Sequence, residues 1–466
     1  MDQAAGTKPL KWYQGLDRYC WVVLIIAALG WLFDTMDQNL YNLVRAPSLR
    51  ELLHPHPDQP TLTSEEKTAL DKQVRDMGGV VTGIFIFGWA TGGLIFGILG
   101  DRLGRTKTMI LTILVYAAFT GGSGLVHSWP LYAFMRFMTG MGVGGEWAAG
   151  AALVAEVFPA RSRPMALGSL QALSSIGNML ASVVTLGIGD LDSRWRWAYF
   201  IGAVPALLVL WIRRSVKEPE QWTEAKEKSG GKEMGNIFNL FTHPTLRRNT
   251  MIAVMMAMAG GIGLWGAGFF STDLLREELV KRGNEPPATV GRLVSIMFLL
   301  QNAGSFFGIY LFAVFSEKVS RRAAFFLWFG LAWVSVLAYY WGVQGSGTGA
   351  FHRAIALAPI MGFCTLGPFA GYTVYFPYLY PTRLRTTGCG FCYNVARYLV
   401  AFGPLALGKL AEGRGYAFAA TIVSSVYILG FIATAMGPET KGKPLPEDKD
   451  FELAPQLSST PATQQS

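Results

Sequence analysis

The stretch FGILGDRLGRTK, residues 96–107, recurs in altered form as LFAVFSEKVSRR, residues 311–322, and this repeat decides the fold. At an offset of 216 residues, Asp101 aligns with Glu317. A second pair of stretches aligns at an offset of 222: EVFPARSRPMALG, residues 156–168, and YLYPTRLRTTGCG, residues 378–390. Repeats at this distance indicate two homologous halves, an organisation common in secondary transporters.

Composition and apolar runs identify the kind of fold. Of the 466 residues 51% are hydrophobic and 15% charged, which is typical of a polytopic membrane protein. Twelve runs are long enough to cross a bilayer, and their limits are 20–44, 78–99, 108–127, 130–155, 164–187, 195–212, 248–273, 290–315, 322–343, 353–380, 386–411 and 415–437. We therefore predict an all-α membrane protein with twelve transmembrane helices in two pseudo-symmetric six-helix bundles.

The same runs give the domain boundaries and the topology. The predicted segments are a cytoplasmic N-terminus, an N-terminal bundle, a cytoplasmic central loop, a C-terminal bundle and a cytoplasmic tail, at 1–19, 20–212, 213–247, 248–437 and 438–466. Together with the residues at the adjoining span ends, predicted inner segments carry 24 Lys and Arg and outer loops 14, so both termini are expected inside. The net charge of +9 thus reflects topology and not a nucleic-acid partner. We expect a monomer in the plasma membrane, such as a bacterial inner membrane.

Two loops contain short structural signals. Thr63 and Ser64 can cap a helix in the outer loop, and Pro219 is placed to begin one in the inner loop. His54 and His56 lie among prolines without further ligands, so we predict no metal site.

The segment RFMTGMGVGGEWAAG, residues 136–150, contains the GxGxxG spacing of a nucleotide-binding loop at Gly140, Gly142 and Gly145. That fingerprint requires a preceding strand, whereas this one lies inside an apolar run. Gly140 and Gly144 instead form GxxxG, which lets one helix press closely against another.

Several motifs together resemble one family. The loop motif between the second and third spans is matched by Gly97, Asp101, Arg102, Gly104, Arg105 and Lys107. With the segment RFMTGMGVGG and the ending PETKGKPL, residues 438–445, the chain resembles transporters of the major facilitator superfamily over residues 18–445. The segment YPTRLRTTGCGFCYNVAR, together with GGEW, is most similar to proton symporters for sialate, lactate and aromatic acids. The resemblance implies a small-molecule substrate, a proton as coupling ion and no other cofactor.

The loop motif also has a physical interpretation as a gate. A carboxylate can accept hydrogen bonds from the first amides of a neighbouring helix and pair with an arginine. The resemblance implies that Asp101 meets the start of helix 11 and Glu317 the start of helix 5. Gly104 permits a tight turn, and Ser320 replaces it in the second copy, which is therefore degenerate. The predicted gating residues are Gly97, Asp101, Arg102, Gly104, Arg105, Glu317 and Arg321. A purely topogenic basic loop would explain the basic residues but not Asp101.

Five charged residues lie within the predicted spans and away from their ends: Asp34, Asp37, Arg136, Glu146 and Arg397. Each would cost roughly 2.5 to 3.5 kcal/mol at the bilayer centre, so they must face the bundle interior, a watery cavity or one another. A buried carboxylate can take up a proton on one side and release it on the other. Glu146, Asp34 and Asp37 are therefore the candidates for proton coupling, although Asp37 lies nearer the outer end.

Arg397 is the candidate for binding an anionic substrate, because a guanidinium offers a fixed fork that matches a carboxylate. Tyr393 and Asn394 share its helix face. Other proposed cavity residues are Arg136, Tyr372, Tyr375, Trp265 and Phe269, and weaker polar candidates are Gln171, Ser174, Ser175, Asn178, Gln301 and Asn302. The alternative is a structural ion pair, which is nearly as plausible for Arg136.

These features favour a proton-coupled symporter of a small organic anion, working by alternating access. A neutral sugar or polyol carrier is the alternative that the PETKG ending suggests. A membrane sensor on a transporter scaffold is less favoured, because the sequence carries no signalling domain. An enzyme is not expected, since no nucleophile with a base and no metal cluster is evident.

Overall fold

The computed structural model describes residues 11–53, 63–188, 191–228, 234–264, 270–281, 287–401, 410 and 414–451. Every regular element in these ranges is a helix. The N-terminal half contains α1 (Arg18–Leu53), α2 (Ser64–Arg102), α3 (Arg105–Ser123), α4 (Trp129–Val157), α5 (Arg163–Ile188), α6 (Leu191–Gly202), η1 (Val204–Leu207) and α7 (Leu208–Ser215). Two short helices, α8 (Glu220–Lys228) and α9 (Asn239–Thr242), lie in the connection to the second half.

The C-terminal half repeats the arrangement of long helices. Its elements are α10 (Pro244–Ile262), α11 (Ser271–Lys281), α12 (Pro287–Lys318), α13 (Arg321–Val343), η3 (Gly347–Gly349), α14 (Ala350–Tyr375), η4 (Phe376–Leu379), η5 (Thr382–Leu384), α15 (Arg385–Val400), α17 (Tyr416–Ser424), α18 (Tyr427–Met436) and η6 (Asp448–Phe451). Each of the twelve predicted spans overlaps one to three of these helices. Eight helical stretches of the described chain are long and apolar enough to cross a bilayer.

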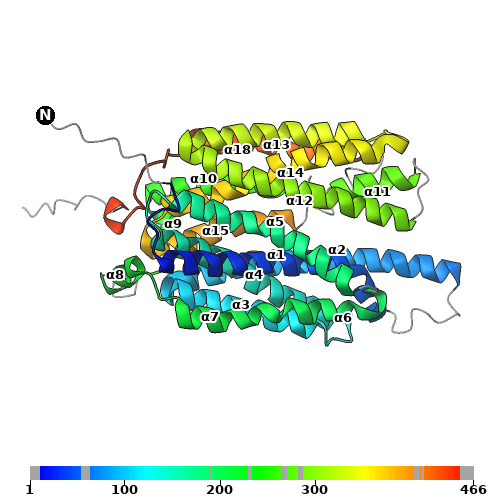
Figure 1. The fold of residues 1–466 in the computed structure, drawn as a ribbon, viewed down its shortest axis with the longest axis horizontal. Coiled ribbons are helices and arrows are strands. Elements are labelled where there is room, and N and C mark those ends of the chain that lie inside the picture. The colour runs from blue at the N-terminus through cyan, green and yellow to red at the C-terminus, as the bar shows by residue number, and fades with distance from the viewer. Residues whose placement is uncertain are drawn as a thin grey trace, which may run out of the picture.

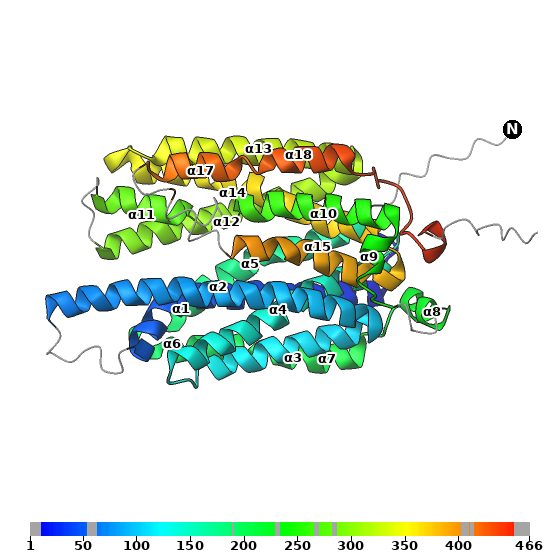
Figure 2. The same ribbon diagram turned by 180° about the vertical axis from the view of Figure 1, so that it is seen from behind.

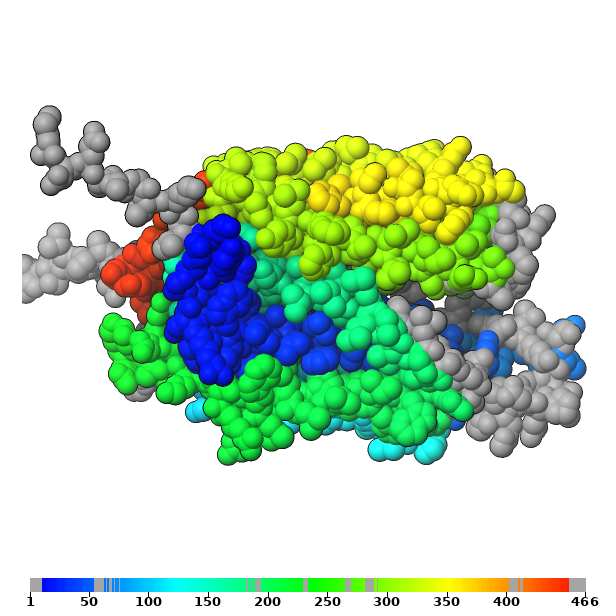
Figure 3. Space-filling model, viewed as in Figure 1, coloured from blue at the N-terminus to red at the C-terminus, as the bar shows by residue number. Residues whose placement is uncertain are grey.

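The long helices of both halves run side by side along one axis, with the two halves stacked as layers (Figures 1 and 2). The helices α8 and η6 lie at one end of the molecule, which the charge distribution predicts to be cytoplasmic and which we call the inner end. The helix α11 and the start of α2 mark the outer end. At the inner end the first described residues cover part of the surface (Figure 3), where the Ser162 hydroxyl donates to the carbonyl of Trp12 at 2.5 Å.

Two helix pairs make the most extensive contacts between the halves. The helix α2 packs against α15, and α5 packs against α12. Within the halves, α2 packs on α4 and α1 on α5, as α12 packs on α14 and α10 on α18. The cavity described below lies between these pairs.

The helices around the outer loop are longer than predicted. The helix α1 continues to Leu53 and α2 begins at Ser64, inside the segment predicted as loop. Thr63 is the N-cap of α2, as expected, and forms a reciprocal capping box with Glu66. This cap begins one continuous helix rather than a short separate one. The helix α8 begins directly after Pro219, as predicted, whereas His54 and His56 lie outside the described residues.

Glycines let α2 and α4 cross at close range. A Cβ atom at Gly140 or Gly144 would overlap the carbonyls of Phe85 and Trp89 on α2. The interpretation of these glycines as a packing motif is therefore confirmed. On α2 itself, Gly88 and Gly92 lie against main-chain carbonyls of α4. Their equivalents at the offset of 216 residues, Gly304 and Gly308 of α12, lie in the same way against carbonyls of α14.

Replacing Gly144 by valine is expected to destabilise the fold, since the new side chain must displace the main chain of α2. The expected cost is about 1–3 kcal/mol or more. The control is Gly79→Ala on the same helix pair, where no atom lies within 4 Å of the added methyl group. Thermal unfolding in detergent measures both variants, and equal transitions would contradict the close crossing.

Candidate functional site

A cavity lies between the two halves and offers about 690 Å³ of space free of protein atoms. Its walls come from α1, α2 and α5 on one side and from α12, α14, α15 and Leu264, just beyond the end of α10, on the other. Amide side chains form much of its polar surface: Gln38, Asn39, Gln171, Asn178, Gln301 and Asn302. Aromatic side chains contribute flat apolar surface: Trp31, Trp89, Phe298, Phe369 and Tyr393. Among the described lining residues Arg397 alone is charged.

Arg397 is buried and held in a fixed orientation. Its Nη1 donates to the Tyr393 carbonyl at 3.0 Å and to Asn394 Oδ1 at 2.7 Å. The guanidinium carbon lies 4.2 Å from the ring centre of Trp89 and 4.3 Å from that of Tyr393. Such cation–π contacts position the group without neutralising its charge.

No carboxylate balances this guanidinium in the part of the chain that the structure describes. The ion pairs among those residues involve other arginines and lysines. The Nε atom of Arg397 is buried and makes no hydrogen bond to any residue that the structure describes. A buried cation with spare donors is a site that an anion can complete.

Tyr393 connects Arg397 to the N-terminal half. Its ring stacks on Trp147 of α4 with centres 3.8 Å apart and planes 12° from parallel. Trp147 in turn donates through Nε1 to Gln171 at 3.1 Å. At this stack the cavity-lining residue Tyr393 of the C-terminal half packs directly on the N-terminal half.

The remaining predicted substrate residues lie at different distances from the cavity. Asn394 supports Arg397 and fits against Gly93 of α2. Tyr372 lines a small adjoining cavity and donates to the Met256 carbonyl at 2.6 Å. Tyr375 is not in either cavity lining and donates to the Pro438 carbonyl at 2.7 Å. Trp265 and Phe269 lie outside the described residues, and the roles of all these residues stay predictions.

Asp34 and Glu146 face each other inside the N-terminal half. Both are almost fully buried, and their carboxyl groups are within hydrogen-bonding reach of one another. Glu146 reaches α1 where Gly30 leaves room for it, because a Cβ atom at Gly30 would overlap Glu146 Oε1. The oxygens of both carboxyl groups accept no hydrogen bond from the N–H and O–H groups of the described residues.

Asp37 and Arg136 form a separate pair. Arg136 Nη1 lies 3.5 Å from Asp37 Oδ2, and its other nitrogens donate to Ser123 and Thr139 at 2.9 to 3.1 Å. Neither residue lines the cavity. The geometry corresponds to the structural ion pair considered for Arg136, with Asp37 and not Glu146 as its partner.

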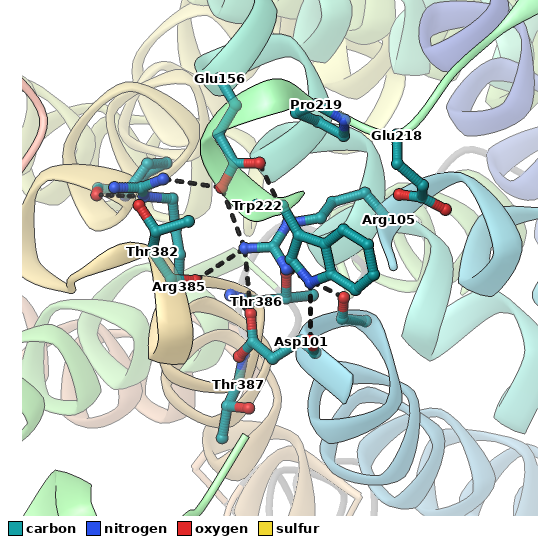
Figure 4. A network of polar contacts seen from close by, with 12 residues as sticks. Asp101, Arg105, Glu156, Glu218, Pro219, Trp222, Thr382, Arg385, Thr386 and Thr387 are labelled. Carbon is teal, nitrogen blue, oxygen red and sulfur yellow. Dashed lines mark hydrogen bonds and ion pairs between the residues drawn. The ribbon is translucent and has the colours of Figure 1, made fainter. Parts of the chain in front are cut away.

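At the inner end the loop motif joins the two halves (Figure 4). Asp101 accepts hydrogen bonds from the main-chain amides of Thr386 at 3.2 Å and Thr387 at 2.8 Å, at the start of α15. Arg105 pairs with Asp101 at 3.1 Å, and its Nη2 also donates to the Thr382 carbonyl at 2.7 Å. The contact predicted between Asp101 and the start of helix 11 is therefore present.

Glu156 completes this contact, which we call the inner latch and define as Asp101, Arg105, Glu156, Arg385 and the first amides of α15. Glu156 pairs with Arg105 at 2.9 Å and with Arg385 at 2.6 Å, and the side chains of all three are fully buried. One carboxylate from the N-terminal half thus neutralises an arginine from each half. Neither Glu156 nor Arg385 was predicted to be a gating residue, although both lie in the second pair of aligned stretches.

The turn of the motif is held by further contacts. Gly104 has φ +118°, a conformation that favours glycine, as expected for the tight turn. Glu218 accepts from the amides of Thr106 and Lys107 at the start of α3. Arg102 is exposed and donates to the Met234 carbonyl at 3.2 Å, while Gly97 faces the main chain of α15.

The second copy of the motif differs in its contacts. Glu317 forms no ion pair among the described residues. Arg321 instead stacks on Tyr378 at 4.0 Å, and Arg163 of α5 donates to the hydroxyl of the same tyrosine at 3.1 Å. Tyr378 therefore lies between two arginines, one from each half. The residue aligned with Tyr378 in the N-terminal half is Glu156, which carries a carboxylate.

Glu439, from the PETKG ending, caps α13 as Glu218 caps α3. It accepts from the Ser320 hydroxyl and from the amides of Arg321 and Arg322. Partial burial raises the pKa of Glu439, but the hydrogen bonds from Ser320 and the nearby amides outweigh it and lower the pKa below its ordinary value. The carboxylate is therefore ionised and suits the N-terminus of a helix.

Removing Glu156 is expected to open the inner end, because Arg105 and Arg385 would then face each other without a counter-charge. Breaking a buried pair costs about 3–5 kcal/mol, enough to raise an open population by about 100-fold or more. The variant Glu156→Ala should expose Cys389, which is fully buried in the first turn of α15. Labelling by a thiol reagent measures this, with the other cysteines replaced by serine.

The matched control for this labelling is Glu224→Ala, on the exposed side of α8. It should label at the rate of the parent protein. Slow labelling of Cys389 in a folded Glu156→Ala protein would show that Glu156 does not hold the inner end closed.

Two repeated helical bundles around a cavity define the architecture of many secondary transporters. The family model of the Major Facilitator Superfamily matches residues 27–279. The chain belongs to this superfamily and is a membrane transporter, not an enzyme.

Individual relatives and a solved structure agree with this assignment. The chain is 31% identical over 418 residues to a probable 4-methylmuconolactone transporter of Cupriavidus pinatubonensis, covering 89% of each chain. It is 27% identical over 427 residues to a putative niacin/nicotinamide transporter of Bacillus subtilis, covering 90% of this chain and 96% of that one. The fold is similar to that of the proton:xylose symporter XylE, with a TM-score of 0.70, 19% identity, and coverage of 93% and 99%.

Proposed function

We propose that this transporter carries a small organic anion together with protons by alternating access. The observation that carries the proposal is Arg397, a buried guanidinium in the cavity wall with no carboxylate partner among the described residues. An anionic substrate would supply the missing charge and accept from the free donor at Nε.

The rest of the cavity supports a substrate with a flat body and polar substituents. Trp89 and Tyr393, which flank the guanidinium, would lie beside the substrate carboxylate. Amide side chains on the opposite wall can donate to and accept from hydroxyl or carbonyl groups. One substrate in a relative's name fits this description, because niacin is a pyridine carboxylic acid.

Asp34 and Glu146 support coupling to protons. Two carboxyl groups within hydrogen-bonding reach and buried away from solvent cannot both be ionised without strong repulsion, so in this proposal the pair holds a proton between them. Acidic residues within a membrane commonly form proton relays. In this proposal the pair gains and loses that proton during each transport cycle.

The inner latch supports alternating access. Its ion pairs bind the N-terminal half to the start of α15, and they must break for the cavity to open at the inner end. The proposal includes a plasma membrane location, such as a bacterial inner membrane, cytoplasmic termini and a monomeric state.

Pairs of acids and their neutral amides test the substrate class. Nicotinate and nicotinamide, benzoate and benzamide, and lactate and lactamide differ only in the group that Arg397 would bind. Acids should raise the unfolding temperature of the purified protein and their amides should not. N-acetylneuraminate tests a larger acid, and xylose tests a neutral sugar. Stabilisation by xylose alone would favour the neutral sugar carrier and overturn the proposal.

A further inference from the structure

The helix α3 carries a row of buried polar side chains inside the N-terminal half. We call Thr108, Thr112, Tyr116, Thr120 and Ser123 the α3 polar face, because they recur every three or four positions. All five are buried, and the residues between them from Met109 to Phe119 are apolar. The row follows α3 from near the inner end toward the outer end.

A packing role explains only part of this row. Thr112 and Ser123 donate to carbonyls of their own helix, as such residues do in membrane helices. The hydroxyl groups of Thr108 and Tyr116 are buried and make no hydrogen bond among the described residues. Unsatisfied hydroxyls in a protein interior are costly unless another group or water completes them.

The middle of the α3 polar face lies against the acidic residues of the half. The Tyr116 hydroxyl lies within the range of electrostatic interaction with the carboxyl groups of Glu146, Asp34 and Asp37. Thr120 lies beside Asp37, since a Cβ atom at Gly202 would touch both side chains. The carboxyl pair and Asp37 thus share one polar interior with α3.

From Asp37 a polar connection continues toward the outer end. Arg136 pairs with Asp37, bonds Ser123 of the α3 polar face and lies 4.7 Å from the ring centre of Tyr199. The Tyr199 hydroxyl is hydrogen-bonded to that of Tyr132.

Beyond the tyrosines the connection reaches groups in contact with solvent. The Tyr132 hydroxyl lies 2.9 Å from that of Ser48. Beside it Trp195 donates to Glu51 at 2.6 Å, and the Glu51 side chain is 34% exposed. The polar interior is therefore linked to the outer surface of the N-terminal half.

This interior is separate from the substrate cavity. The helix α1 presents Trp31, Thr35 and Gln38 to the cavity, whereas Asp34 and Asp37 lie on the neighbouring helix face. None of Asp34, Asp37, Tyr116, Arg136 and Glu146 lines the cavity. A proton arriving by way of the described cavity would have to pass α1.

We propose that protons reach the Asp34–Glu146 pair from the outer end through the interior of the N-terminal half, by Tyr132, Tyr199, Asp37 and the α3 polar face. This inference rests on the proposed proton coupling. At each hydroxyl, and at each water molecule that would bridge two groups not in direct contact, one O–H bond forms as another breaks. The hydroxyls and waters end unchanged, and the carboxyl pair gains one proton from the outer solvent. Arg136 keeps its protons and holds Asp37 in place.

Tyr116→Phe tests the route, because it removes one hydroxyl and keeps the ring. In proteoliposomes, uptake of nicotinate, benzoate, lactate or N-acetylneuraminate driven by an inward proton gradient should fall at least about tenfold. Exchange of the same acid across the membrane at equal pH needs no net proton transfer and should stay within about twofold of wild type. Thr120→Val is a second variant, for which we likewise expect reduced proton-driven uptake and nearly unchanged exchange.

Tyr427→Phe is the matched control, since it removes a buried hydroxyl without a described partner in the C-terminal half. It should leave both rates unchanged. If Tyr116→Phe and Thr120→Val lose proton-driven uptake and exchange equally, the α3 polar face serves only in packing. If proton-driven uptake is unchanged in both variants, the proposed proton route is also wrong. If the wild-type protein takes up the acid at the same rate with and without the proton gradient, the proposed proton-coupled function is itself contradicted.

Discussion

Replacement of Arg397 by alanine is expected to reduce organic anion uptake by about 100-fold or more, because the substrate carboxylate would lose its buried counter-charge. Arg397→Lys should retain part of the activity, since an ammonium keeps the charge without the fork. Initial uptake rates in proteoliposomes measure both variants.

Arg353→Ala is the control, because this arginine is exposed and only donates to the Gly342 carbonyl. It should transport like wild type. Because Arg397→Ala removes a contact with Trp89 and with Tyr393, thermal unfolding is measured to verify that this variant is folded. Normal uptake by a folded Arg397→Ala protein would exclude Arg397 from substrate binding.

Replacement of Glu146 by glutamine, or of Asp34 by asparagine, is expected to abolish proton-driven accumulation. Each amide keeps the shape of the side chain but removes an ionisable group from the shared proton site. Transport down a substrate gradient should continue, so the accumulation ratio should fall to about one while exchange persists. The two single variants should behave alike, because the proton belongs to the pair.

The control for these amide variants is Glu224→Gln on the exposed surface of α8. It should accumulate substrate like wild type. Accumulation at the wild-type level in both Glu146→Gln and Asp34→Asn would move the proton site elsewhere.

The sequence was sufficient to predict the helices and the internal symmetry. Apolar length predicts a span wherever it occurs, so each predicted span overlaps a helix. The repeat was visible in Asp101 and Glu317, and the glycine crossings of α2 with α4 and of α12 with α14 repeat at the offset of 216 residues. Helix ends were less predictable, because the Thr63 capping box extends α2 beyond its apolar run.

Partners of the buried charges could not be predicted from the sequence. The sequence singled out Arg136 and Glu146 on α4, but their partners Asp37 and Asp34 lie on α1 and depend on how the two helices face each other. Periodicity within one helix cannot give that rotation. Glu156 was missed for the same reason, since it lies near a helix end and gains its meaning from Arg385 in the other half.

Cavity residues on α1 and α2 were also missed. Gln38 and Asn39 follow Asp37 directly, and polar residues so close together in an apolar run were a usable signal. Trp89 had no such signal, because aromatic residues are common in spans. Its contact with Arg397 exists only because α2 packs against α15 across the two halves.

Uptake of a labelled acid into proteoliposomes under an imposed proton gradient tests organic anion and proton symport most directly. For one proton per substrate, a gradient of one pH unit stores about 1.4 kcal/mol and should give about tenfold accumulation inside. Protein-free liposomes correct for weak acids that cross the bilayer unaided. The predicted result is accumulation that a protonophore abolishes and that Arg397→Ala and Glu146→Gln lack. Uptake that stops at equal concentrations on both sides, whatever the gradient, would contradict it.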